Sequence, residues 1–521
     1  MAEIKIIPAK YLEQEVPDYR GNPLIEALPP IYFPDDVIRL LRVDPKYHEG
    51  EREYEATYRF HFIRRLFWYF QPLPVHIDIE GRISRTIRQS YLSRNPVTPQ
   101  YAKSLAQGAE TIREGSLDIF DDADFNASGF SIIGMSGVGK TTAIKKVLSL
   151  YPQTILHTNY KGSPLFLTQL VWARLDCPFD GSLKGLCMSF FDYVDRVLGT
   201  DYAKKFSAYR MTVDQAMLKM AQIARTHCLG LLVIDEIQHL HQAKGVGQEI
   251  MLNFFVNLVN TVGIPVVLIG TTKAMSILQS EFRQARRSSG HEGDLLWERM
   301  ENDISWEVML RAMWKNQWTQ KHIKFTEELK NVLYDESQGI IDIAVKLYVF
   351  AQAKAMGDRT EEVTVAAIRE AAAVKLKSLK KYFDAIRSGD VKKMAQYEDI
   401  RPISVDDYLA AQYSRIAATV PDFSKEAAIS LEEQAVITLL EMDIPSKIAR
   451  SAVRKVIEKS TVGQPLSSVV KKAFKLALNM EKDKEQPEQT EQKDDLRNTG
   501  AGDSYENLKS SGVIAETADE F

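Results

Sequence analysis

The fold is decided by residues 130–148, which read FSIIGMSGVGKTTAIKKVL. An apolar run, Phe130 to Ile133, precedes a glycine-rich turn, and a run with helical character, Ala143 to Leu148, follows it. Strand, glycine-rich turn and helix form the context that a phosphate-binding loop requires. Glycines let backbone N–H groups approach a polyphosphate, and the N-terminus of the helix adds a positive dipole end.

This loop predicts a bound nucleoside triphosphate with Mg²⁺. Lys140 is expected to reach the β- and γ-phosphates, and the hydroxyl of Thr141 is expected to bind the metal. The alternative is a decayed loop that no longer binds nucleotide. The predicted phosphate-binding residues of the loop are Gly134, Ser136, Gly137, Val138, Gly139, Lys140, Thr141 and Thr142.

A second apolar run, Leu229 to Ile234, ends in two acids, Asp235 and Glu236. Such a run is typical of a central parallel strand that is buried on both faces. At its carboxyl end Asp235 can bind nucleotide and Mg²⁺, and Glu236 can orient or deprotonate an attacking water. An acid in this second position favours hydrolysis of the triphosphate over transfer to a small acceptor. The alternative is a solvated strand end.

A third run, residues 265–272, reads PVVLIGTT and places Thr271 at a strand end, where it can hydrogen-bond the water or the γ-phosphate. A threonine that only caps the strand is the alternative. The stretch EFRQARR at 281–287 follows. In an assembling ATPase an arginine here often stabilises charge on a neighbour's γ-phosphate, so Arg286 and Arg287, then Arg283, are candidates. A basic solvated face is the alternative.

Length and composition predict a soluble globular protein of two to four domains. The chain has 521 residues, of which 45% are hydrophobic and 26% are charged. It contains no run of 18 apolar residues and no signal peptide, so we expect no membrane segment and no export. The three cysteines, at 177, 187 and 228, lack zinc or disulfide spacing, which fits a reducing cytoplasm.

The net charge of −4 conceals an uneven distribution. Residues 481–521 contain 12 acids and 5 bases, a net of −7, so the remainder carries −4 + 7 = +3. This mild excess permits a basic surface for nucleic acid without proving one.

Candidate strands at 130–133, 170–175, 231–234 and 266–269 alternate with helix-like stretches, which is the pattern of an α/β parallel sheet. We predict a nucleotide-binding core at 101–310, a helical lid at 311–385, a helical region at 386–480 and a disordered acidic tail at 481–521. Residues 1–100 are predicted to form an N-terminal region that docks a partner. Within it, the cation-rich aromatic run Tyr58 to Phe70 could stack on bases, dock a protein or be a buried amphipathic segment.

Two C-terminal features add to this organisation. Residues 469–476 read VVKKAFKL, which predicts a basic amphipathic helix. The tail ends in a short apolar stretch that suits a docking peptide, and a featureless tail is the alternative.

Together, the loop, the acidic strand end, the Gly-Thr-Thr strand and the helical lid resemble an AAA+ ATPase. The amino-acid sequence is similar to that of the TnsC group of transposition regulators over roughly residues 15–385. The similar stretches are YRGNPLIEALPP at 19–30, DGSLK at 180–184, LGLLVIDEIQHL at 229–240 and EIMLNFFVNLVNTVGIPVVLIGTT at 249–272.

The resemblance implies a function that the motifs alone do not give. Proteins of the TnsC type form ATP-dependent rings or filaments on double-stranded DNA. They connect a TniQ-type target-selection protein to the transposase and its partner endonuclease, and so license DNA transposition. DNA would be contacted through backbone phosphates without strong sequence preference. The candidates by position are Lys184, Thr200, Lys204 and Lys205, and a solvated surface is the alternative for each.

One position departs from the AAA+ pattern. Many AAA+ lids carry an arginine a few residues after a glycine, but the residues after Gly339 include Asp342 instead. Either Lys346 substitutes for the arginine or the lid contact is missing, so we expect slow, regulatory hydrolysis. Two other functions stay open: a loader or remodeller acting on a replication helicase, and a scaffold in which nucleotide is structural.

Overall fold

The computed structural model describes residues 6–99, 101, 103, 127–207, 211–242, 246–260, 262–275, 293–388, 405–417, 435–436, 438–440, 442, 444–458 and 466–482. Residues 1–419 and 420–521 form two compact units. The first unit holds the motifs described above. The five regions expected from the sequence, and the four boundaries between them, stay predictions.

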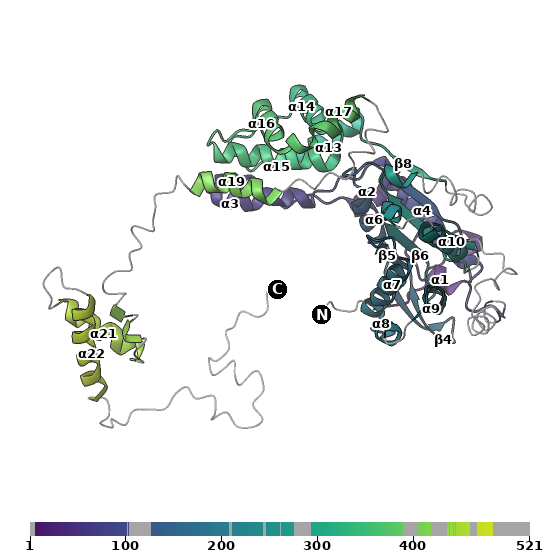
Figure 1. Cartoon of the computed structure of the whole chain (residues 1–521), viewed down its shortest axis with the longest axis horizontal. Helices are drawn as coiled ribbons and strands as arrows, with labels where there is room; N and C mark the ends of the chain where they lie inside the picture. Colours follow the sequence, from purple (N-terminus) through teal and green to yellow (C-terminus); the bar gives the residue numbers. More distant parts are fainter. Residues whose placement is uncertain are drawn as a thin grey trace. The chain divides into compact units, whose positions relative to one another are not determined.

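A parallel five-stranded sheet forms the centre of the first unit (Figure 1). Its strand order is β5-β6-β7-β2-β8. The bounds are β2 Phe130–Gly134, β5 Trp172–Asp176, β6 Leu231–Asp235, β7 Val266–Gly270 and β8 Leu295–Trp297. The strands predicted at 130–133, 231–234 and 266–269 are confirmed, and so is the α/β class.

Burial of both sheet faces explains why these strands are continuously apolar. In β6, Leu231 and Val233 belong to one hydrophobic cluster, whereas Leu232 and Ile234 belong to another. Successive side chains of a strand point to opposite faces, so both faces of β6 must be covered. All four residues are fully buried.

Helices cover the sheet on both sides. One cluster contains residues of α4 (Pro74–Leu92) and α6 (Lys140–Leu148). The other contains residues of α7 (Leu183–Leu198), α9 (Val213–Thr226) and α10 (Val246–Asn260), and the short α8 (Tyr202–Ser207) contacts α7. In α4, the predicted apolar row Ile83, Ile87 and Tyr91 is fully buried.

A second sheet lies between α6 and β5 in the sequence. Strands β3 (Thr154–Tyr160) and β4 (Ser163–Leu170) form an antiparallel hairpin, and β1 (Ile6–Pro8) pairs in parallel with β3. The tight turn at Lys161 and Gly162 has positive φ at both residues, as two-residue hairpin loops of type I′ require. The expected strand at 170–175 was therefore wrong in extent, because Leu170 ends β4 and β5 begins only at Trp172.

The helices after the sheet pack into the predicted lid. They are α13 (Ile304–Trp314), α14 (Glu327–Ser337), α15 (Ile341–Gly357), α16 (Val365–Lys375) and α17 (Lys380–Ser388). The expected apolar face of α15 is buried, including Ile343, Leu347 and Phe350. Figure 1 shows α19 (Val405–Ala417) and α3 (Ala56–Phe62) side by side along α15, in agreement with their contacts.

The N-terminal segments contribute to the same interior as the core and the lid. Besides α3 and α4 they include α1 (Pro23–Glu26), α2 (Pro34–Leu41) and the 3₁₀ helix η3 (Ile63–Trp68). Within the aromatic run 58–70, Phe60, Ile63 and Leu66 are buried, whereas Trp68 is 72% exposed. The run is therefore an amphipathic segment with one buried face.

Two further observations concern the described residues alone. No helix among them combines the length and the apolar character that crossing a bilayer demands. All three cysteines are buried and form no disulfide.

Candidate nucleotide-binding site

The loop between β2 and α6 has the backbone that its glycines predict. Gly137 and Gly139 have φ values of 82° and 110°, which residues with a side chain rarely adopt. At Gly134 a Cβ atom would lie 2.2 Å from the carbonyl oxygen of Trp297, so β8 approaches β2 too closely for any side chain. Gly139 is the N-cap of α6, which begins at Lys140 and directs its first N–H groups toward the loop.

Lys140 is buried beneath this loop. Its Nζ donates to the carbonyl oxygens of Gly134 at 2.7 Å and Met135 at 2.8 Å. These bonds hold the ammonium group against the loop backbone. Of the other predicted loop residues, Val138 is buried, whereas Ser136 and Thr142 are exposed. The loop thus presents backbone, one cation and two hydroxyls to its surroundings.

The predicted metal-binding pair lies in direct contact. The hydroxyl of Thr141 donates to Oδ2 of Asp235 at 2.8 Å, although the two residues are 94 positions apart. Arg174 of β5 also reaches Asp235 Oδ2, at 3.3 Å, and it contacts Asp176 as well. Burial raises the pKa of Asp235, and the bond from Thr141 opposes this increase.

This donor set fits Mg²⁺ bound together with a polyphosphate. A hydroxyl and a carboxylate are the oxygen ligands that P-loop proteins supply to Mg²⁺. No group of three or more His, Cys, Asp or Glu side chains among the described residues could hold a metal ion alone. A cation at Thr141 and Asp235 would therefore need phosphate oxygens and water as its remaining ligands.

Glu236 follows in a left-handed backbone conformation with φ of 57°. Its amide N–H donates to Asp235 Oδ1 at 2.9 Å, and its carboxylate accepts a hydrogen bond from Nε2 of Gln238. The other end of the same amide, Gln238 Oε1, accepts the backbone N–H of Thr271 at 3.1 Å. Gln238 lies in the 3₁₀ helix η5 (Ile237–Gln242) and joins the acidic strand end to the end of β7.

Thr271 is buried, and its hydroxyl oxygen has no hydrogen-bond partner in the described part of the chain. Buried hydroxyls without a partner are uncommon in folded proteins. Such a group fits a site that a γ-phosphate or a positioned water would complete. The structure therefore brings Lys140, Thr141, Asp235, Glu236 and Thr271 to one edge of the sheet, where the carboxyl ends of parallel strands meet.

A cavity of about 150 Å³ opens beside the loop. Its walls come from three places: the loop itself, the N-terminal segment at 66–76, and the lid helices α13 and α15. Its lining residues are Leu66, Phe67, Tyr69, Phe70, Gln71, Leu73, His76, Gly137, Val138, Gly139, Thr142, Met309, Ile341, Asp342 and Val345. Apolar and aromatic walls next to phosphate-binding backbone suit a nucleotide base.

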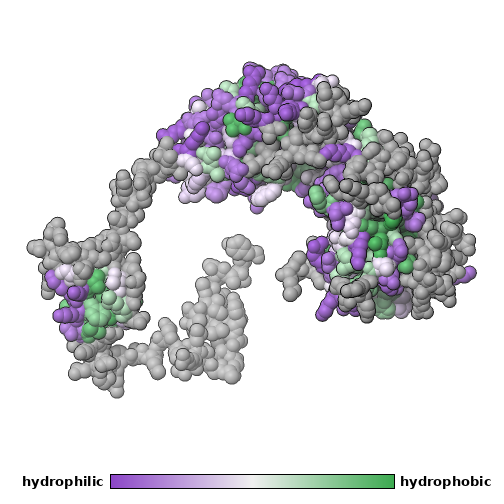
Figure 2. All heavy atoms as spheres, viewed as in Figure 1, coloured by the Kyte–Doolittle hydropathy of each residue, from purple (hydrophilic) through white to green (hydrophobic). Residues whose placement is uncertain are grey.

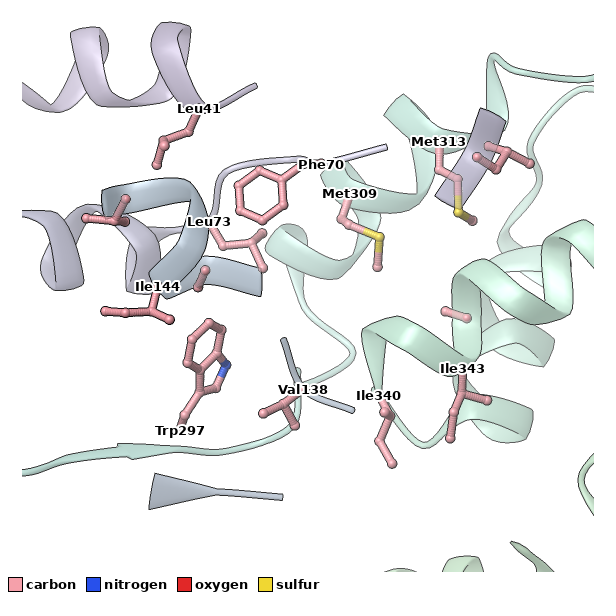
Figure 3. Close-up of a cluster of buried hydrophobic side chains, with 14 of the residues drawn as sticks. Leu41, Phe70, Leu73, Val138, Ile144, Trp297, Met309, Met313, Ile340 and Ile343 are labelled. Carbon is pink, nitrogen blue, oxygen red and sulfur yellow. The ribbon is translucent and has the colours of Figure 1, made fainter. Parts of the chain in front are cut away.

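Sequence reasoning missed this cavity because its N-terminal wall lies more than 60 residues before the loop. Figure 3 shows Phe70 and Leu73 close to Ile144, with Val138, Met309 and Ile340 in the same group of buried side chains. The only signal in the sequence was the aromatic run that ends at Phe70, and that run pointed equally to a partner. At the cavity, burial lowers the pKa of His76 to about 4, so its ring is neutral at pH 7.

The lid meets the loop through backbone atoms. The amide of Asp342 donates to the carbonyl oxygen of Gly137 at 3.3 Å, and a Cβ atom on Gly137 would lie 3.0 Å from Ile340 Cγ2. Lys346 forms an ion pair with Asp342 on its own helix. The described lid therefore places an acid and its paired lysine at the cavity, and the idea that Lys346 acts on the γ-phosphate stays a prediction.

The remaining predicted residues are placed as follows. Lys184 donates to the carbonyl oxygen of Met211, Thr200 donates to Asp195, and Lys205 pairs with Asp201. Lys204 is exposed on α8. The role of these four residues toward DNA stays a prediction. Arg283, Arg286 and Arg287 lie outside the described residues.

Comparison with known proteins identifies the domain that contains this site. Residues 123–278 match a family described as AAA domain. No curated protein matches the chain. The chain therefore contains an AAA domain with the AAA+ fold, and AAA+ ATPases bind ATP or ADP, typically with Mg²⁺.

Several solved structures are similar to the chain at low sequence identity. The ORC1 protein of Aeropyrum pernix in complex with DNA has 12% identity and a TM-score of 0.35, covering 64% of this chain and 87% of that chain. Cdc6p from Pyrobaculum aerophilum has 12% identity and a TM-score of 0.32, covering 75% and 98%. The RuvB branch migration motor of Thermotoga maritima has 14% identity and a TM-score of 0.29, covering 60% and 86%.

Proposed function

We propose that this protein is an ATP-hydrolysing AAA+ regulator that assembles on double-stranded DNA and licenses DNA transposition. The observation that carries the ATPase part is the contact between Thr141 and Asp235 beneath the glycine-rich loop, with Glu236 next in the chain. This contact joins the two proposed metal ligands, and the proposed base is the next residue in the chain. The transposition part rests on the resemblance of residues 15–385 to the TnsC group.

The chemistry is hydrolysis of the β–γ phosphoanhydride bond by water. Lys140 and the N–H groups at the start of α6 bind the phosphates and oppose their charge. Mg²⁺, when bound through Thr141 and Asp235, supplies further charge neutralisation. Glu236 accepts the proton of the attacking water, and the Thr271 hydroxyl donates toward the γ-phosphate or the water.

Slow turnover suits this arrangement. The lid places Asp342 rather than a free arginine at the cavity, and its lysine is already paired. Transition-state charge is then stabilised fully only if a neighbouring protomer supplies Arg286 or Arg287, so hydrolysis would depend on assembly. An ATPase of this kind acts as a timer, in which the triphosphate state holds the oligomer together on DNA and hydrolysis lets the oligomer disassemble.

In this proposal the oligomer, a ring or filament, contacts DNA through backbone phosphates. It presents its other surfaces to a TniQ-type target-selection protein and to the transposase with its endonuclease partner. ATP-dependent assembly then decides when and where insertion is licensed.

Binding to labelled duplex DNA tests the proposal. It is measured with ATP, a slowly hydrolysed analogue, ADP or no nucleotide, for wild type, Lys140→Ala and Lys145→Ala. Lys145 is exposed on the same helix, so its variant controls for the lost charge. We expect the triphosphate to strengthen binding by wild type and Lys145→Ala, and to give no such increase for Lys140→Ala. Equal affinity for DNA with and without nucleotide, or no binding at all, would overturn the proposal of a DNA-assembling regulator in favour of a remodeller or scaffold.

A second assay addresses transposition itself. The protein is combined with a transposase, an endonuclease and a TniQ-type protein of the same transposon class, a donor element and a target plasmid. We expect insertion to require wild-type protein and ATP. Insertion at an undiminished level without the protein would refute the licensing role, even where DNA binding depends on ATP.

A further inference from the structure

The C-terminal unit, residues 420–521, has a hydrophobic core of its own. Its two long helices are α21 (Ser446–Glu458) and α22 (Leu466–Lys482), which pack against each other. The core residues are Ala435, Leu439, Ile444, Ile448, Ala449, Ala452, Val453, Val456, Val469, Val470, Ala473 and Ala477. None of these residues belongs to the clusters that surround the central sheet.

The helical part of this unit, residues 435–482, is basic, although residues 420–521 as a whole contain 14 Lys and Arg and 19 Asp and Glu, a net of 14 − 19 = −5. Residues 435–482 contain nine Lys and Arg and four Asp and Glu, a net of 9 − 4 = +5, whereas the chain as a whole has −4. Among the side chains described in these helices, seven cations are exposed, and Glu458 is the exposed acid. The exposed cations are Lys447, Arg450, Arg454, Lys455, Lys471, Lys472 and Lys475.

Most of these cations form rows on the helix faces that point away from the core. In α21 the row Lys447, Arg450 and Arg454 has the i, i+3, i+7 spacing of one helix face, and in α22 Lys471 and Lys475 are four residues apart. Successive members of a row are separated by about 5 Å along the helix, from a rise of roughly 1.5 Å per residue. Figure 2 shows hydrophilic residues gathered along one edge of this unit, beside a hydrophobic area.

We infer that the basic helices α21 and α22, called the basic unit below, bind the phosphate backbone of double-stranded DNA independently of nucleotide. The inference rests on the proposed function, because that function gives the chain a DNA substrate. Rows of Lys and Arg that protrude from short helices can neutralise successive phosphates of a duplex. Binding of single strands would instead use exposed aromatic rings, and the aromatic residue of the described helices, Phe474, is half-buried against the core.

This contact would give the protein two DNA-binding surfaces, of which only one depends on nucleotide. Assembly of the AAA+ unit on DNA depends on the triphosphate, whereas the basic unit is built from residues far in sequence from the loop. Two binding modules on one chain raise each other's effective concentration at the DNA. A protomer that has hydrolysed ATP would therefore stay near the duplex instead of diffusing away.

The test uses the full chain and a duplex of random sequence. A basic-unit variant carries Lys447→Gln, Arg450→Gln, Lys471→Gln and Lys475→Gln, all at exposed positions. A matched control carries Lys315→Gln, Lys324→Gln, Lys377→Gln and Lys381→Gln, four exposed lysines of the first unit with the same total charge change. Circular dichroism confirms that both are folded, and affinity is measured without nucleotide and with ATP across a series of salt concentrations.

We expect wild type and the control variant to bind weakly without nucleotide, and the basic-unit variant to lose this binding. With ATP, the slope of log affinity against log salt should fall by about 0.9 for each phosphate contact removed, up to about 3.6 for four. Equal affinity and slope for all three proteins would overturn the inference and leave the proposed function intact. If the basic-unit variant lost binding to an acidic protein but bound the duplex as wild type does, the inference would also be overturned. Absence of ATP-dependent binding by wild type would instead count against the proposed function.

Discussion

A buried ion pair ties the N-terminal segment to the lid. Arg59 of α3 and Glu361, which follows α15, form two hydrogen bonds, from Nη1 at 2.6 Å and from Nη2 at 2.7 Å. The side chain of Arg59 is 2% exposed and that of Glu361 is 14% exposed. Arg59 also donates to the carbonyl oxygens of Tyr54 at 2.7 Å and Trp318 at 2.9 Å.

Removing either partner should destabilise the first unit, and by different amounts. Glu361→Gln leaves the guanidinium charge buried without an anion, which costs about 3–5 kcal/mol in unfolding free energy. Arg59→Met leaves the Glu361 carboxylate, which water can reach and which still accepts a hydrogen bond from the backbone N–H of Gln320 at 3.1 Å. We therefore expect a smaller loss of unfolding free energy, about 2–3 kcal/mol. The double variant Arg59→Met/Glu361→Gln should lose less stability than the sum of the two single variants, with a coupling energy of about 2 kcal/mol.

The assay is urea unfolding followed by tryptophan fluorescence. Trp318, whose carbonyl accepts from Arg59, is fully buried and reports on this junction. The control is Arg64→Met, which removes an exposed ion pair to Asp406 whose side chains are 53% and 78% exposed. Such a pair contributes about 0–1 kcal/mol. The reasoning is refuted if Arg59→Met shifts the transition no more than Arg64→Met, or if the coupling energy is below about 0.5 kcal/mol.

The remaining predictions concern the site and the tail. Glu236→Gln should trap an ATP-bound oligomer on DNA, seen as slow release from labelled duplex, and loss of DNA binding would count against Glu236 as the base. Gln238→Met removes both hydrogen bonds of the amide group at similar side-chain size, so kcat should fall about 10- to 100-fold with KM little changed; an unchanged kcat would make Gln238 merely structural. His76 has a pKa of about 4 when folded and about 6.5 when unfolded, so its stabilisation is present above pH 6.5 and is lost toward pH 4. Between pH 7 and pH 5 wild type should therefore lose about 2 kcal/mol more than His76→Asn in denaturant titrations, and equal losses would contradict this. Removing residues 481–521 should spare ATP-dependent oligomers, measured by light scattering, but weaken insertion in the transposition assay; undiminished insertion would exclude a role for the tail.

The central sheet could be predicted because its burial leaves a simple pattern. Strands β2, β6 and β7 are covered on both faces, so apart from Ser131 and the terminal Asp235 their positions are apolar or glycine and the runs stand out in the sequence. The hairpin β3–β4 has exposed residues on one face, and polar residues such as His157 and Gln169 interrupt its apolar pattern. At three residues, β8 is too short for any period to show.

The site was predictable where chemistry is concentrated in one motif, and not where it depends on packing. Lys140 and Asp235 stand in recognisable motifs, and the parallel topology brings them together. The role of Gln238 is different, because its partner at Thr271 is fixed by the close approach of η5 to Gly270, where a Cβ atom would lie 2.6 Å from Ile237. The cavity beside the loop is walled in part by a segment near residue 70, and no local sequence pattern reveals that this segment packs there.

The shared interior of the N-terminal segment, the loop and the lid makes residues 66–76 part of the wall around the proposed nucleotide site. Phe70 and Leu73 form one wall of the cavity, and Met309 and Val345 form another. A protein that holds the N-terminal segment in one position would therefore change how tightly ATP is held. By linkage, ATP must change the grip of that protein by the same factor. Binding of a partner to the N-terminal segment could thus change ATP affinity without any contact at the phosphates.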